Sequence, residues 1–104
     1  MLSIIKQCEK ELKEFPVSVK EDLADAMALL DEGLNLSMPL SKPMPSIGSG
    51  VHELRFKDRS GNYRVVYFIR KHADIFLIHA FQKKSKKTPK ENIELAKQRL
   101  MGVI

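Results

Sequence analysis

The sequence predicts a single α+β domain over residues 1–104, with an N-terminal helical hairpin, a three-stranded antiparallel sheet and a C-terminal helix. Two observations predict it. Apolar residues recur every three to four positions over residues 3–34, whereas residues 51–82 contain apolar runs separated by turn residues. A chain of 104 residues is also long enough to bury one modest core.

Two helices are predicted in the N-terminal half. The first covers residues 3–14 and ends at Phe15, because a residue that precedes proline avoids helical dihedral angles. The second starts at the capping box Ser18–Glu21 and ends near Gly33. Residues 35–50 contain three prolines and two glycines, which predicts a loop.

Three strands are predicted next. Residues 51–57 alternate between apolar and charged side chains, and residues 63–70 and 74–82 are apolar on both faces, as expected of buried strands. The turn residues of Asp58–Asn62 and Lys71–Asp74 separate these strands. Neighbouring strands are therefore expected to pair antiparallel.

The last helix is expected over about residues 89–101, with Thr88 as its cap, Pro89 at the first position and Glu91 at the capping-box spacing. The preceding stretch is rich in lysine and lies between two ordered elements, which should hold its ammonium groups in place. These lysines are Lys83, Lys84, Lys86, Lys87 and Lys90.

The charge is unevenly distributed along the chain. The net charge is +5, but residues 1–50 carry five lysines and eight acidic residues, whereas residues 51–104 carry thirteen basic and five acidic residues. An anionic partner, either a nucleic acid or an acidic protein, is therefore expected to bind the C-terminal half.

The composition also limits the location and the chemistry. No apolar run approaches the roughly 20 residues that a membrane helix needs, and the first residues lack the features of a signal peptide. Cys8 is the single cysteine and fits a core position. A cytoplasmic protein without membrane contact is expected. No His, Cys or carboxylate spacing suits zinc, so neither a metal nor a cofactor is expected.

Basic residues of the predicted sheet form the first candidate site. Arg55, Arg64 and the lysines after the last strand come from adjacent strands, so they could converge on one surface suited to a phosphate. Phe81 offers a ring on which a base could stack. A solvated basic face above a core that contains the aromatic residues is the alternative.

Histidines are the second candidates. His52 and His79 lie in predicted strands, and either could act as a general acid or base because imidazole titrates near neutrality. A hydrogen-bonded structural role is the alternative for each. His72 lies in the second turn and is expected to be inert.

Four segments resemble a phage-derived branch of the RelE/HigB toxin family, namely Gly50–Phe56, Asn62–Phe68, His79–Pro89 and Glu94–Leu100. They contain the pieces Glu-Leu-Arg, Tyr-Arg-Val-Val-Tyr and Phe-Gln-Lys-Lys-Ser-Lys-Lys-Thr-Pro in this order. The resemblance implies a RelE-like fold and the toxin of a type II toxin–antitoxin system. Such toxins are endoribonucleases that cut mRNA in the ribosomal A site without a metal.

The resemblance also implies a mechanism and partners. The RNA 2′-OH attacks the neighbouring phosphate, while basic residues stabilise the developing charge and assist proton transfer. The implied partners are the ribosome, its mRNA and a helix-turn-helix antitoxin that forms heterotetramers with the toxin.

By motif position, the resemblance assigns catalytic roles at the scissile phosphate to Arg55 and Arg64, and a further basic role to Lys83 or Lys84. It assigns proton transfer to His79 and base stacking to Phe81. The remaining lysines are expected to hold RNA, namely Lys57, Lys86, Lys87 and Lys90.

We expect two departures from the family pattern to affect the size of the sheet and the catalytic residues. Many relatives begin with a strand, but Met1–Ile5 runs into a helical pattern, which predicts a smaller sheet with one exposed edge. The chain also lacks the C-terminal tyrosine or histidine that some members carry, so catalysis would depend on His79 and the lysines.

Two other functions stay open. The same superfamily resemblance includes non-enzymatic toxins that inhibit DNA gyrase, although those generally lack a clustered basic site. The third reading is an inactive relative that binds nucleic acid, which predicts salt-sensitive RNA binding without cleavage.

Overall fold

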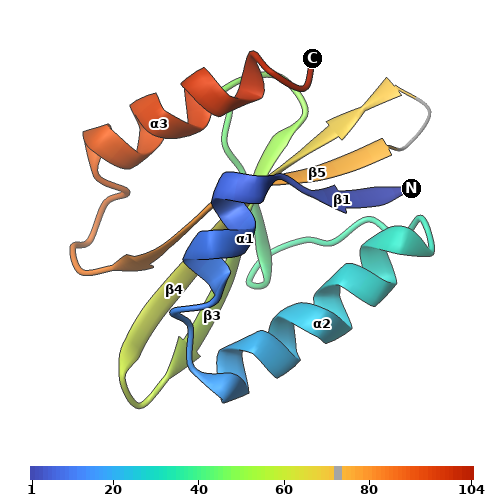
Figure 1. The fold of residues 1–104 in the computed structure, drawn as a ribbon. Helices are drawn as coiled ribbons and strands as arrows, with labels where there is room; N and C mark the ends of the chain where they lie inside the picture. Colours follow the sequence, from blue (N-terminus) through green and yellow to red (C-terminus); the bar gives the residue numbers. More distant parts are fainter. Residues whose placement is uncertain (72–73) are drawn as a thin grey trace.

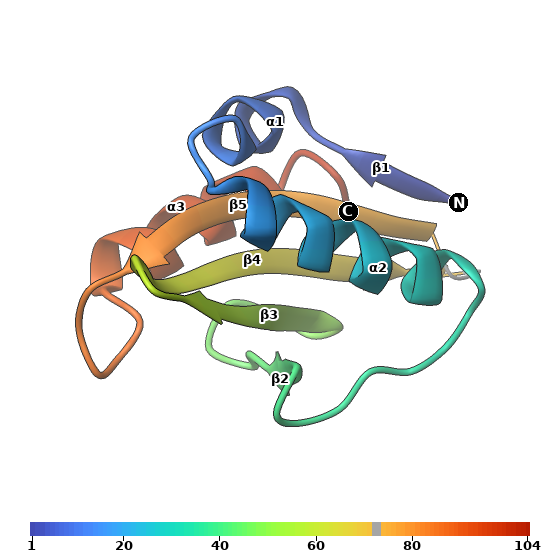
Figure 2. The same ribbon diagram turned by 90° about the horizontal axis from the view of Figure 1, so that it is seen from below.

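The structure is a computed structural model that describes residues 1–71 and 74–104. The strands are β1 (Leu2–Ile4), β2 (Ser41–Pro43), β3 (Val51–Asp58), β4 (Gly61–Arg70) and β5 (Asp74–Lys83), and the helices are α1 (Lys6–Leu12), α2 (Val17–Asp31) and α3 (Lys90–Leu100). The strands form one mixed sheet in the order β1-β5-β4-β3-β2, which Figure 2 shows from one edge to the other. None of the helices in the described part of the chain has the length and hydropathy of a membrane span.

The prediction of a three-stranded antiparallel sheet is wrong, because the sheet has five strands and includes the N-terminal strand β1. β1 pairs parallel with β5, with Leu2 opposite Ile75 and Ile4 opposite Leu77, and the N–H of Ile5 donates to the carbonyl of Leu77 at 3.1 Å. A strand of three residues is too short to show a period in the sequence, and the helical spacing of α1 begins directly after it. The predicted exposed edge is therefore wrong, because β1 covers that side of β5.

The predicted helical hairpin is also wrong. α1 packs mainly on β5 and α2 mainly on β3, so each helix contacts the sheet separately. The expected capping box is absent, since α2 begins at Val17 without a side-chain cap and Ser18 Oγ donates instead to Asp58 Oδ2 at 3.0 Å. The loop predicted over residues 35–50 contains β2, in which Ser41 pairs with Leu54 of β3.

The three predicted C-terminal strands are confirmed. β3, β4 and β5 pair antiparallel in sequence order, and β4 lies in the middle of the sheet, as its apolar character on both faces predicts. Gly61 provides the positive φ of 139° where the chain turns from β3 into β4. The turn predicted at Lys71–Asp74 includes residues 72–73, so this turn and the prediction for His72 lie outside the described residues.

Each face of the sheet has its own hydrophobic cluster. Figure 1 shows α2 and α3 on opposite sides of the sheet. Because successive side chains of a strand point to opposite faces, Val65 of β4 packs with α1 and α2, whereas Val66 packs with Ala96 and Leu100 of α3. α3 covers only part of its face, and the charged residues of β3 and β4 lie on the same face.

Candidate functional site

Charged side chains cross the sheet on the face that carries α3. Arg55 of β3 lies opposite Arg64 of β4, and Arg64 lies opposite Phe81 of β5. In the neighbouring row, Asn62 of β4 lies opposite Lys83 of β5. Residues that lie directly opposite one another share a face, so the register brings cations from three strands to one end of this face.

A cavity of about 250 Å³ is lined by residues of β2, β3, β5 and the loop that leads into α3. It is called the basic cleft below. Its lining contains five basic residues and one acidic residue, so it favours an anion electrostatically. The lining residues are Lys42, Met44, Glu53, Arg55, Lys83, Lys86, Lys87, Thr88 and Ile93.

A buried ion pair lies beside the cleft. Glu53 is 2% exposed and Arg64 is 5% exposed, and Arg64 Nε lies 3.3 Å from Glu53 Oε1. The distance meets the limit for an ion pair, but Arg64 Nε has no acceptor with hydrogen-bond geometry among the described residues. The contact is therefore an ion pair in which the Nε–H of Arg64 makes no hydrogen bond to the described residues. Arg64 itself does not line the cavity, whereas Glu53 and Arg55 do.

The loop before α3 is tied to the cleft by two side-chain hydrogen bonds. Lys83 Nζ donates to the backbone carbonyl of Lys86 at 2.7 Å, and Thr88 Oγ1 donates to Glu53 Oε2 at 3.1 Å. The predicted capping role of Thr88 is therefore wrong, and α3 begins at Lys90 without a side-chain cap. These bonds hold part of the lysine-rich segment against the sheet.

The pKa values show that the cations of the cleft are close enough to repel one another. Burial lowers the pKa of Lys83, the charges of Arg64, Arg55 and Lys42 lower it further, and Glu53 acts in the opposite direction. The pKa of Arg64 is likewise lowered, first by burial and then by Arg55, against the effect of Glu53. One internal carboxylate thus faces an excess of positive charge, which an external anion would relieve.

The other predicted lysines lie outside the cleft lining. Lys84 and Lys90 are exposed at the surface. Lys57 is also exposed and lines a separate cavity between β3 and α2, next to Arg55. Within residues 1–71 and 74–104, no group of His, Cys, Asp and Glu side chains is arranged so that it could hold a metal ion.

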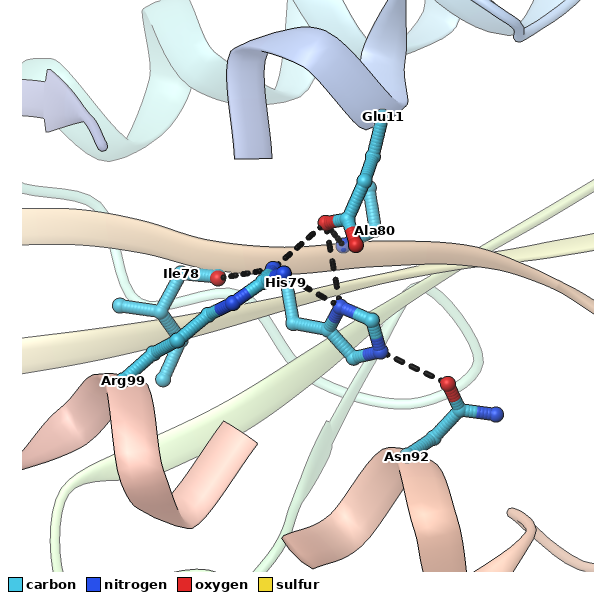
Figure 3. A network of polar contacts seen from close by, with 6 residues as sticks. All are labelled: Glu11, Ile78, His79, Ala80, Asn92 and Arg99. Atoms are coloured by element: carbon cyan, nitrogen blue, oxygen red, sulfur yellow. Dashed lines mark hydrogen bonds and ion pairs between the residues drawn. The ribbon is translucent and has the colours of Figure 1, made fainter. Parts of the chain in front are cut away.

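His79 belongs to a second polar cluster, which joins α1, β5 and α3 (Figure 3). Its Nδ1 lies 3.1 Å from Glu11 Oε1 and its Nε2 lies 2.7 Å from Asn92 Oδ1, while Arg99 Nη1 donates to Glu11 Oε1 at 2.7 Å. Glu11, His79, Asn92 and Arg99 are called the histidine network below. His79 is 2% exposed and stacks on Phe81, an arrangement that supports the structural alternative for this histidine.

The carboxylate of the network is strongly held in its ionised form. Burial alone would raise the pKa of Glu11, but hydrogen bonds from His79, Arg99 and the backbone N–H of Ala80 lower it to about 2. The ring of His79 fits this arrangement in two ways. Its Nδ1 donates to Glu11 when protonated, and otherwise accepts from Arg99 Nη1 at 3.1 Å.

His52 lies on the opposite face of β3 from Glu53 and stacks on Tyr67, with ring centroids 5.3 Å apart. Its Nδ1 is buried without a hydrogen-bond partner among the described residues. Tyr67 in turn shares a hydrogen bond of 2.6 Å with Ser41 of β2. His52 is therefore separated from the basic cleft by the sheet.

The site predicted from the sequence did not include Glu53, Lys42, Glu11 and Arg99. The alternation of β3 could have identified Glu53, because it lies two residues before Arg55 on the same face. Lys42 and Glu11 reach their clusters only through the packing of β2 and α1, which no local pattern indicates.

The fold and the cleft define a small α+β protein with a basic surface site suited to an anion. The chain belongs to the family described as phage derived protein Gp49-like (DUF891), whose sequence model matches residues 10–101. The phage-derived part of the resemblance is thereby confirmed, while the assignment to RelE/HigB stays a prediction. No curated protein is significantly similar to the chain in sequence.

Proposed function

We propose that the protein is the toxin of a type II toxin–antitoxin system and cleaves mRNA on the ribosome as a RelE/HigB-like endoribonuclease. Membership of the Gp49-like family supports a phage-derived toxin, and the strand motifs support the RelE/HigB branch. The observation that carries the proposal is the basic cleft, in which Arg55 and Lys83 line one cavity together with Lys86 and Lys87.

The reaction that suits this cleft is an internal transesterification of RNA. The 2′-oxygen loses its proton to a base and attacks the adjacent phosphorus. The bond from phosphorus to the 5′-oxygen breaks, and that oxygen takes up a proton. The products are a 2′,3′-cyclic phosphate and a 5′-hydroxyl end. Negative charge develops on the phosphoryl oxygens during this step, and preorganised cations stabilise it.

The residues of the cleft have different roles in this reaction because their charged groups differ. Arg55 presents a planar guanidinium to two phosphoryl oxygens, and Lys83 presents a compact ammonium. Lys83 is also the candidate for proton transfer, because it lines the cavity together with Arg55 and because burial and the neighbouring cations lower its pKa. Arg64 adds positive charge next to Glu53, with which it forms an ion pair. Of the two lysines that match the basic position of the motif, Lys83 is preferred to Lys84 because it lines the cavity.

The other lysines suit the holding of RNA. Lys86 and Lys87 extend the cleft along the loop. Lys57 lies two residues after Arg55 and Lys90 lies three residues after Lys87, and both are exposed. Such contacts provide affinity that depends on salt but not on base sequence. The partners required by the proposal are the ribosome with its mRNA in the cytoplasm, and a helix-turn-helix antitoxin that neutralises the toxin.

Primer extension on a reporter mRNA tests the proposal. Wild-type protein is added to translating ribosomes and to naked RNA, beside Arg55→Ala and the control Arg59→Ala, which removes an exposed arginine from the turn between β3 and β4. New 5′ ends that need ribosomes, persist in Arg59→Ala and vanish in Arg55→Ala are expected. Growth arrest in cells that express the protein, without cleavage in either reaction, would point to a non-nuclease target such as gyrase. Salt-sensitive RNA binding alone would indicate an inactive relative.

A further inference from the structure

We propose that Glu53 is the positioning residue of the basic cleft. It holds Arg64 and the segment of residues 84–89, called the lysine loop below, in the arrangement that receives the RNA phosphate. The inference rests on the proposed function and extends it to a residue of opposite charge. A carboxylate in a cleft for an anion repels the ligand, so its presence there requires a compensating role.

The two oxygens of Glu53 contact two different parts of the chain. Oε1 lies 3.3 Å from Arg64 Nε on the neighbouring strand β4, and Oε2 accepts a hydrogen bond of 3.1 Å from Thr88 Oγ1 in the lysine loop. The residue is 2% exposed. A carboxylate at that depth is costly unless it is paired and hydrogen-bonded, so its two contacts define its position closely.

The lysine loop connects Glu53 to Lys83 through two hydrogen bonds. Thr88 anchors one end of the loop on Glu53. The carbonyl of Lys86, two residues earlier, accepts the hydrogen bond from Lys83 Nζ at 2.7 Å. α3 begins directly after the loop without a side-chain cap. The place of the Lys83 ammonium therefore depends on a loop whose anchor on the sheet is Glu53.

Positioning and simple repulsion predict opposite results when the charge of Glu53 is removed. If Glu53 only repelled RNA, Glu53→Gln would bind RNA more tightly and cleave it faster. If Glu53 positions Arg64 and the loop, the same variant would bind RNA at least as tightly, because the cleft becomes more positive, but would cleave it more slowly. Tighter binding with slower cleavage is not the result of general unfolding.

The first experiment compares wild type, Glu53→Gln and Glu21→Gln, which removes an equal charge from the exposed side of α2. The cleavage rate is measured at saturating ribosome concentration, and affinity is measured with a 2′-O-methyl RNA oligonucleotide that cannot be cut. We expect cleavage by Glu53→Gln to fall about 100-fold, as for a misplaced catalytic group, without weaker binding. Equal or faster cleavage by Glu53→Gln would overturn the proposal.

The second experiment needs no catalytic activity. Thr88→Val removes the hydroxyl with little change of shape, and Thr88→Ser keeps it. Hydrogen–deuterium exchange over residues 84–89 should become faster in Glu53→Gln and Thr88→Val and stay unchanged in Thr88→Ser and Glu21→Gln. Cleavage by Thr88→Val should fall about tenfold, the equivalent of one lost hydrogen bond to a charged group.

The two experiments separate the two proposals. If wild type cuts no RNA, the proposed function fails, while the exchange data still decide whether Glu53 holds the lysine loop. If wild type cuts RNA but exchange over the loop is unchanged in both Glu53→Gln and Thr88→Val, the role of Glu53 is overturned and the proposed function stands.

Discussion

The histidine network and the basic cleft each connect the sheet to a neighbouring segment through one carboxylate, which is partly buried in the network and buried in the cleft, but they differ in how far their charges are satisfied. In the network, one oxygen of Glu11 is contacted by His79, by Arg99 and by a backbone N–H. In the cleft, Glu53 is contacted by Arg64 and by one hydroxyl. Glu53 is the single acidic residue of a lining that contains five basic residues.

This difference separates a structural cluster from a site that can take a ligand. A polar cluster whose donors and acceptors are matched gains nothing from an external partner. Arg64 Nε, by contrast, has no hydrogen-bond acceptor among the described residues, and the cations around it lower the pKa of Lys83. Variants that change one cluster at a time should therefore alter activity and stability separately.

The largest effect is expected from Lys83→Met, which removes the ammonium from the basic cleft and keeps the length of the side chain. Cleavage should fall by a factor of about 100 to 1,000, as for the loss of one group that stabilises transition-state charge. Primer extension with translating ribosomes measures the loss. Lys84→Met is the matched comparison, because Lys84 is exposed outside the lining, and its loss should be less than about tenfold. Equal losses would contradict the assignment to Lys83.

Arg99→Ala tests the histidine network. The change removes the hydrogen bond of 2.7 Å to Glu11 and should lower the free energy of unfolding by about 2 to 3 kcal/mol, as for a hydrogen bond to a charged group. Urea denaturation followed by circular dichroism measures it. Lys97→Ala on the same helix is the control, since its ion pair with Glu94 is exposed and should contribute little. Loss of cleavage by the folded Arg99→Ala protein would mean that the histidine network contributes to activity as well as to stability.

The network also predicts a response to acid. The pKa of Glu11 is lowered from 4.5 to about 2 in the folded protein, so between these values the unfolded chain binds more protons and stability falls as pH falls. Above about pH 4.5, Glu11→Gln should be less stable than wild type by about 3 kcal/mol, and the difference should close towards pH 2. Denaturation curves across this range measure it. A difference that stays constant with pH would show that Glu11 is not held as a carboxylate.

The smallest effect concerns the affinity of the lysine loop for RNA. Lys86→Ala and Lys87→Ala should each reduce the slope of log affinity against log salt concentration by about 0.7, as for one lost phosphate contact with a single strand. Titrations of a 2′-O-methyl oligonucleotide at several salt concentrations measure the slope. Lys10→Ala, an exposed lysine on α1, should leave it unchanged. An equal change in Lys10→Ala would mean that the overall charge, and not the cleft, attracts RNA.

The fold could be predicted where an element is long enough to show its own period. β3, β4 and β5 have eight to ten residues each, and their alternation or apolar character indicates strands. β1 and β2 have three residues each, and they are strands only because a longer strand lies beside them. The capping boxes predicted at Ser18 and Thr88 are absent because both hydroxyls donate to carboxylates that are distant in the sequence.

The candidate site was predictable to the extent that it follows from strand alternation. Arg55 and Lys83 line the cavity from β3 and β5, the two strands that flank β4. Phe81 and His79 share their strand with Lys83, but stack on one another. The neighbours of His79 come from α1 and α3, which lie far from it in the sequence. Contacts of that kind depend on how the helices pack, which a single sequence does not reveal.

The parallel pairing of β1 with β5 has a consequence for synthesis of the chain. Residues 2–4 are made long before their partners at 75–77, and α1, with seven residues, is too short to be stable alone. The N-terminal segment therefore stays unfolded in the nascent chain until β5 has been made, because its contacts are non-local. β5 ends at Lys83, so the same late segment completes both the sheet and the wall of the cleft. An incomplete chain that stops before β5 has neither.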